Sequence, residues 1–192
     1  RYGAGVTALA QWSQDFYPRL GADLLAATGV DAEVHATGLY WLDLKDESQA
    51  LTWSARVGRG LHALALSEVR QRVPALGADF SRALYLPGVA NVRNPRLVRA
   101  LRTALQQMAN VTLHEECEVT GLIGDAGRVL GVRTAAGEVR GGRVVVAAGA
   151  WSGRLLASLG LHLPVEPVKG QMILYKCAED FLPAMVLAGG RY

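Results

Sequence analysis

The sequence has few of the residues that build disulfide frameworks and metal centres. Its 192 residues include only two cysteines, Cys117 and Cys177, which form no CxxC pair and have no histidine at metal-ligand spacing. This pattern predicts two reduced thiols in a cytoplasmic protein and no metal site.

Known catalytic motifs are also missing. The chain has no nucleophile elbow, zincin motif or phosphate-binding loop, and its four histidines stand far apart in no recognisable catalytic frame. We therefore nominate no catalytic residue. If this chain takes part in chemistry, we expect a bound cofactor to supply it.

Excess charge and long apolar runs are lacking as well. The 20 basic and 17 acidic side chains leave a net charge of +3, which is too small to indicate a nucleic-acid or membrane-surface partner. No apolar run approaches the roughly 20 residues that span a bilayer, and no signal peptide is visible. Arg96, Arg99 and Arg102 lie along one predicted helix, where we interpret them as a solvated surface.

Neither end of the chain resembles the end of a natural protein. The sequence starts with Arg1 in place of methionine and ends at Tyr192 with no tail-like composition, so we expect a fragment or a processed chain. The apolar content of 51% is enough for a core within one or two domains.

In the first half of the sequence, the residue pattern predicts helices alternating with short strands. Helical spacing of apolar residues predicts a helix over 6–28, which Pro18 should kink or restart and Gly29 should end. The other predicted elements of this half are strands over 34–42 and 83–86, a helix from Asp46 to Val57, and a short helix capped by Ser67.

The strongest local signal predicts a helix from Pro95 to Ala109. Asn94 is a favourable N-cap residue, and proline suits the first helical position. The predicted apolar face consists of Leu97, Val98, Leu101, Ala104, Leu105 and Met108.

The second half predicts closely spaced strands followed by a helix. After a short strand over 111–113, tight turns separate strands over 119–123, 129–134 and 138–140, which should form a meander. A last strand is predicted over 143–147, and its uniformly apolar part over 144–147 indicates burial on both faces. Residues 164–175 predict a crossing segment and a strand.

Small residues follow that predicted buried strand. Ala147, Ala148 and Gly149 would leave the main chain bare at the carboxyl end of a strand, where open α/β sheets bind ligands. Ser152 is placed to cap the next helix, whose N-terminus would favour a pyrophosphate. The alternative is a tight turn in which the small residues only pack.

A second glycine pattern is a weaker candidate. Gly3 to Ala8 matches the G-x-G-x-x-G/A dinucleotide pattern, but only two residues precede it. Because the pattern needs a buried strand that leads into the turn, we expect a loop before a helix.

Three segments together resemble the FAD-dependent glycine oxidase/D-amino acid oxidase family, most closely the bacterial glycine oxidases linked to thiamine synthesis. They are 86–95 with the helix after it, VVVAAGAWSG over 144–153, and PVKGQM over 167–172. Sarcosine oxidase and D-amino acid dehydrogenase are related families that share much of this pattern.

The resemblance implies FAD as the cofactor and assigns positions to it. Val119 would meet the adenine, the flavin-proximal turn would consist of Ala147, Ala148, Gly149 and Trp151, and Tyr192 would line the substrate cavity. The family's first strand with its glycine-rich turn and its substrate-binding arginine have no counterpart in this sequence. We therefore expect the chain alone to bind FAD weakly or not at all and to be inactive.

The resemblance also implies an α/β fold, with part of a doubly wound FAD-binding domain and its β-meander beside a mixed α+β substrate domain. Residues 1–87 would belong mainly to the substrate domain, 88–160 to the FAD-binding domain, and 161–192 to the return into the substrate domain. The implied activity is oxidation of glycine, small secondary amines or D-amino acids with reduction of O2 to H2O2. The alternatives are a sarcosine oxidase-like or D-amino acid dehydrogenase relative, or a flavin-free fragment with no activity. A homo-oligomer is compatible with each of them.

Overall fold

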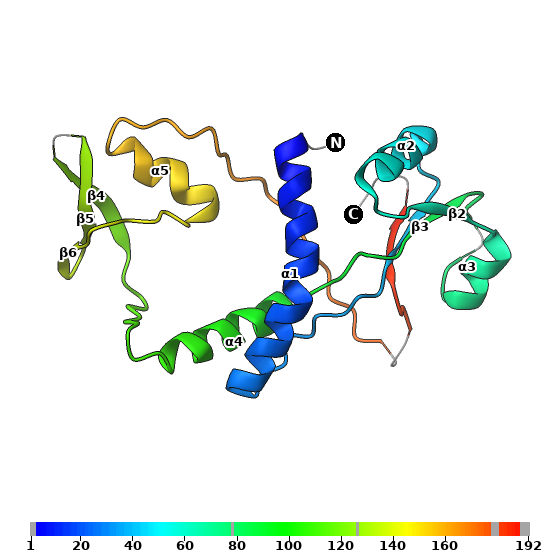
Figure 1. Ribbon diagram of the computed structural model, residues 1–192, viewed down its shortest axis with the longest axis horizontal. Coiled ribbons are helices and arrows are strands. Elements are labelled where there is room, and N and C mark those ends of the chain that lie inside the picture. Colours follow the sequence, from blue (N-terminus) through cyan, green and yellow to red (C-terminus); the bar gives the residue numbers. More distant parts are fainter. Residues whose placement is uncertain (1–2, 78, 126, 178–180, 189–192) are drawn as a thin grey trace. The chain divides into compact units, whose positions relative to one another are not determined.

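The computed structural model describes residues 3–77, 79–125, 127–177 and 181–188, and it has the mixed α/β fold that the sequence predicts (Figure 1). The described residues form two compact units. One unit holds the residues up to Val111 together with those from Lys176 onward, and the other is Thr112–Tyr175. The domain boundaries expected after residues 87 and 160 differ from the limits of these units and stay a prediction.

Two helices of the first unit pack against each other. Helix α1 (Ala4–Thr28) runs through Pro18 without the restart allowed for in the sequence analysis. Gly29 ends it as predicted, because its backbone is left-handed (φ +70°) and its N–H donates to the Leu25 carbonyl at 2.9 Å. Leu24 of α1 packs with Leu97 and Ala100 of helix α4, and Ala32, in the segment after α1, completes the cluster.

Helix α4 (Asn94–Gln106) differs in detail from its prediction. Asn94 is the first helical residue, while Arg93 holds the cap position, and the helix ends three residues before Ala109. Ala100 is fully buried whereas Val98 is 62% exposed. The contact with α1 therefore uses Leu97 and Ala104 of the predicted apolar face together with Ala100, which that prediction did not include.

A four-stranded sheet forms the centre of the first unit. Its order is β2 (His62–Leu64), β3 (Ala83–Leu86), β1 (Leu39–Leu42) and β7 (Met185–Ala188), with β1 and β7 parallel and the other pairs antiparallel. The strand predicted over 34–42 is shorter than expected. Gly38 has a left-handed backbone (φ +71°) that interrupts it, and His35 forms only an isolated bridge with Asn91.

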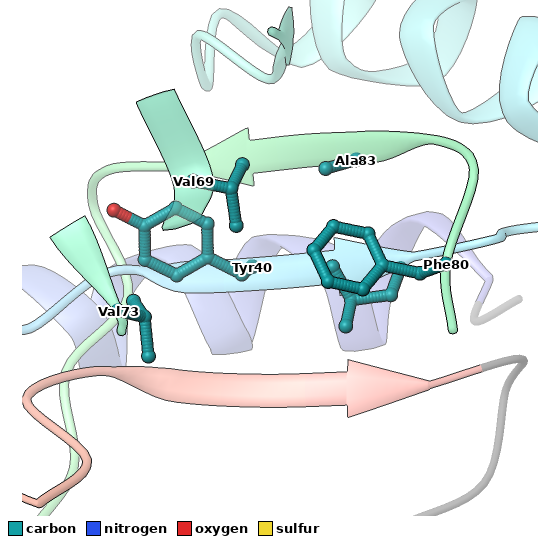
Figure 2. Close-up of a cluster of buried hydrophobic side chains, with 6 residues drawn as sticks. Tyr40, Val69, Val73, Phe80 and Ala83 are labelled. Carbon is teal, nitrogen blue, oxygen red and sulfur yellow. The ribbon is translucent and has the colours of Figure 1, made fainter. Parts of the chain in front are cut away.

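Helices cover both faces of this sheet, so alternate residues of each strand enter different cores. On one face, helix α3 (Leu66–Arg72) and the residue after it place Val69 and Val73 beside Tyr40, with Phe80 and Ala83 completing the cluster (Figure 2). On the other face, helix α2 (Glu47–Val57) packs Ala50 against Leu61 and Leu84. The two clusters fix the sheet independently of the second unit.

Helix α2 matches its prediction, whereas the cap predicted for helix α3 is wrong. Helix α2 spans the predicted residues, and Gly58 ends it with a left-handed backbone (φ +67°). Helix α3 exists as predicted, but Ser67 is its second residue and Ala65 holds the cap position.

The second unit contains the predicted β-meander. Strands β4 (Val119–Asp125), β5 (Arg128–Thr134) and β6 (Gly137–Arg140) are antiparallel neighbours in that order. A single 3-10 turn, η1 (Gly149–Trp151), leads into the short helix α5 (Ser152–Ala157), which packs on β4.

Three predicted strands are not formed. Residues 111–113, 143–147 and 164–175 have no regular structure, and Val145, Val168 and Met172 are 87%, 91% and 91% exposed. The apolar run over 144–147 forms no strand, because within the described residues no other strand lies beside it to supply ladder hydrogen bonds. The expectation of a strand buried on both faces is therefore wrong for this structure.

None of the helices among the described residues combines the length and the apolar character needed to cross a membrane.

Asp43, just after β1, holds the start of β3. One of its carboxylate oxygens accepts hydrogen bonds from the Ser81 N–H (3.0 Å), the Ser81 hydroxyl (2.9 Å) and the Arg82 N–H (3.0 Å). These donors, the Ser81 N–H foremost, lower the pKa of Asp43 below its ordinary value because they stabilise the charged form.

We predict that Asp43→Asn destabilises the chain at neutral pH and that this effect disappears in acid. A carboxylate with a lowered folded-state pKa contributes stability above its unfolded-state pKa, and the contribution is lost as the pH falls through the folded-state value. Urea denaturation midpoints measured across the acidic range test this, with Asp23→Asn on the exposed face of α1 as control. A gap between wild type and Asp43→Asn that stays constant into strong acid would contradict the role of the charge.

Candidate functional site

A cavity in the Thr112–Tyr175 unit brings together most of the predicted cofactor residues. Its volume is about 530 Å³, within the range of roughly 300–1,000 Å³ that is usual for small-molecule sites. Strands β4 and β5 form one wall, and the extended segment over 144–148 with the start of α5 forms the other.

Helix α5 is held in place by contacts with β4. The Ser158 hydroxyl, just after the helix, accepts the Leu122 N–H at 3.5 Å and donates to the Leu155 carbonyl at 2.7 Å. Leu159 packs so closely on Gly124 that a β-carbon there would lie 3.0 Å from its side chain. These contacts hold α5 against β4.

The turn between the extended segment and α5 exposes its main chain. The Trp151 N–H donates to the Ala148 carbonyl at 3.1 Å, which closes the 3-10 turn. Gly149 has a left-handed backbone (φ +55°), and a β-carbon at this position would meet no atom within 4 Å. The turn is therefore open and lies beside the cavity rather than being filled by its own neighbours.

The predicted cofactor residues have different positions in this geometry. Val119, Ala147, Ala148 and Trp151 line the cavity, whereas Gly149 lies in the turn next to it. Tyr192 lies outside the described residues. The roles of all six toward FAD and substrate stay predictions.

Two further expectations concern glycine-rich turns and helix starts. Ser152 is the first residue of α5 and is 7% exposed, so it does not hold the predicted cap position, which Trp151 occupies. At the start of the chain, Gly3 directly precedes α1 and Gly5 lies within it. Residues 4–8 are therefore already helical, so the loop expected at this glycine pattern is not formed.

The charged residues of the cavity were not predicted from the sequence. Glu118, directly before β4, and Arg154, in α5, both line it, while the other lining residues are uncharged. The two residues are 36 positions apart in the sequence, so spacing alone could not identify them as a pair. The packing of α5 on β4 brings both to one cavity.

The lining suits the binding of a cofactor better than acid–base chemistry. Among the described residues around the cavity there is no histidine, cysteine, lysine or tyrosine. The described part of the chain also holds no group of three or more acidic, histidine or cysteine side chains able to bind a metal ion. Apolar walls beside an exposed main chain match a ring system carried on a nucleotide.

Comparison with known proteins agrees with this geometry. The family model for FAD dependent oxidoreductases matches residues 1–190. Glycine oxidases from Pseudomonas putida and Pseudomonas aeruginosa are each 62% identical over all 192 residues, which correspond to 53% of either relative. The crystal structure of glycine oxidase from Geobacillus kaustophilus is 30% identical, with a TM-score of 0.87 over 98% of this chain and 52% of that one. The chain thus spans about half the length of the relatives it matches.

Gly131 of β5 allows the backbone of β6 to approach closely. A β-carbon there would lie 2.9 Å from the Arg140 α-carbon and 3.1 Å from the Val139 carbonyl carbon, both in the backbone of β6. We predict that Gly131→Ala destabilises the unit by about 1–3 kcal/mol, because backbone atoms cannot move aside without breaking the ladder.

Gly121→Ala in β4 is the matched control, since its nearest neighbour would be the Arg133 guanidinium at 3.7 Å. Urea denaturation followed by tryptophan fluorescence measures both variants. Equal stability of the two would show that the close approach at Gly131 is not required.

Proposed function

This chain belongs to the FAD dependent oxidoreductase family, and from that premise we propose that it is part of a flavin-dependent oxidase of glycine, small secondary amines or D-amino acids. The observation that carries the proposal is the cavity beside the bare turn at Ala147 and Ala148. The 62% identity with two glycine oxidases supports glycine as the first substrate to test. The expected link with thiamine synthesis is part of the same proposal.

The proposed reaction is oxidation of an amine to an imine. A hydride leaves the substrate Cα and a proton leaves its nitrogen, after which the imine is hydrolysed. Oxygen takes up the two electrons and two protons to give H2O2. Bound FAD would supply the electron carrier, while the protein provides binding and orientation.

Residues of this chain would hold the cofactor in two places. The backbone at Val119 would meet the adenine, and the exposed main chain from Ala147 to Gly149 would lie against the rest of the dinucleotide. Trp151 is 68% exposed at the edge of the same cavity, where an aromatic ring can pack on the cofactor. We also propose a cytoplasmic location, which the free Cys117 and Cys177 support.

A substrate panel tests the function. The full-length protein that carries this chain should copurify with FAD and release H2O2 with glycine, sarcosine and D-alanine. Activity with an artificial electron acceptor but not with O2 would instead indicate a dehydrogenase. A colourless protein that cannot be reconstituted with FAD would contradict the proposal.

Gly149→Val tests the bare turn. A branched side chain would occupy the open space beside the cavity, so we predict that the variant binds FAD at least about tenfold more weakly. Fluorescence quenching of FAD by the full-length apoprotein measures the dissociation constant.

Gly127→Val is the matched control for this variant. Gly127 also has a left-handed backbone (φ +79°) with no atom within 4 Å of a β-carbon, but it lies in the β4–β5 turn away from the cavity. Both variants carry a similar backbone strain, and only Gly149→Val should weaken FAD binding. An equal effect of the two would assign the loss to strain alone.

A further inference from the structure

Arg154 is the cationic group of the cavity. Its side chain contributes to the lining together with Glu118, which lies directly before Val119 at the start of β4. The remaining lining residues carry no charge. Any anionic part of a ligand in this cavity would therefore be attracted to Arg154 and repelled by Glu118.

The guanidinium of Arg154 is available for such a ligand. Several other arginines are paired: Arg93 and Arg96 with Glu33, Arg72 with Glu68, and Arg140 with Glu138. Across the described residues, by contrast, Arg154 has no hydrogen bond or ion pair. Nothing within that part of the chain competes with a ligand for its donors.

The position of Arg154 is fixed by the packing of α5. The Ser158 and Leu159 contacts with β4 hold the helix against the meander, so the arginine is presented from a fixed backbone at the cavity. The helix is too short for its N-terminus to form an anion site of its own. The positive charge offered to the cavity is thus that of the side chain.

We propose that Arg154 binds the diphosphate of the dinucleotide cofactor, an inference that rests on the proposed function. A guanidinium donates paired hydrogen bonds to phosphate oxygens, which are stronger than those between neutral groups. Glu118 would then lie at the nucleoside end beside Val119, where hydroxyl groups can donate to its carboxylate. The positive charge of Arg154 and the negative charge of Glu118 would thereby orient the dinucleotide in the cavity.

The test compares Arg154→Gln with Arg154→Lys in the full-length oxidase. We expect the FAD dissociation constant to rise about fivefold in Arg154→Gln, and Arg154→Lys to recover part of the loss because it keeps the charge. Salt should weaken FAD binding in the wild type more than in Arg154→Gln. Arg140→Gln, in β6 outside the cavity, is the control and should bind FAD like the wild type.

Competition with FAD separates a phosphate contact from a general loss of structure. ADP should compete less well with FAD in Arg154→Gln, while adenosine, which has no phosphate, should compete equally well in both proteins. An unchanged FAD dissociation constant, or equal losses for ADP and adenosine, would overturn the role of Arg154. A wild-type protein that binds no FAD would overturn the proposed function itself, and the role of Arg154 with it.

Discussion

The packing of helix α5 against strand β4 is the contact on which the candidate site depends. The Ser158 hydroxyl bonds to the Leu122 N–H, and Leu159 lies against Gly124, where no larger residue would fit without displacement. This contact closes one side of a cavity whose other side is the meander. Without it, Val119 and Arg154 would belong to separate surfaces. Substitutions that loosen α5 should therefore affect the binding of a cofactor before they affect any chemistry.

The two units use their apolar side chains differently. In the first unit, the helices α2 and α3 bury both faces of a four-stranded sheet, which gives it separate cores around Leu84 and Tyr40. In the second unit, the apolar side chains line a cavity and leave part of the backbone bare. The first unit is thus closely packed, while the second unit has the open turn at which we propose that the cofactor binds.

The sequence predicted those features that depend on local signals. Gly29 and Gly58 end helices because only a left-handed residue continues the chain there, and the tight turns after β4 and β5 force a meander. The strand predicted from the apolar run over 144–147 was wrong, because a strand also needs a neighbour with which to pair. Glu118 and Arg154 were missed for a related reason, since the packing of α5 on β4 brings them together rather than any spacing. Caps such as Asn94 and Ser67 were misplaced by one or two residues, because Arg93 and Ala65 hold those positions without a side-chain cap hydrogen bond and the usual residue preference does not apply.

We propose that the main chain from Ala147 to Gly149 is free of side-chain cover because it faces the cofactor. Hydrogen–deuterium exchange of the full-length protein, with and without FAD, tests it directly. We predict that FAD slows exchange of the amides in the η1 turn and at the start of β4, and leaves those of β6 unchanged. Exchange in the turn that is the same with and without bound FAD would contradict the account, because the backbone would then have no contact with the cofactor.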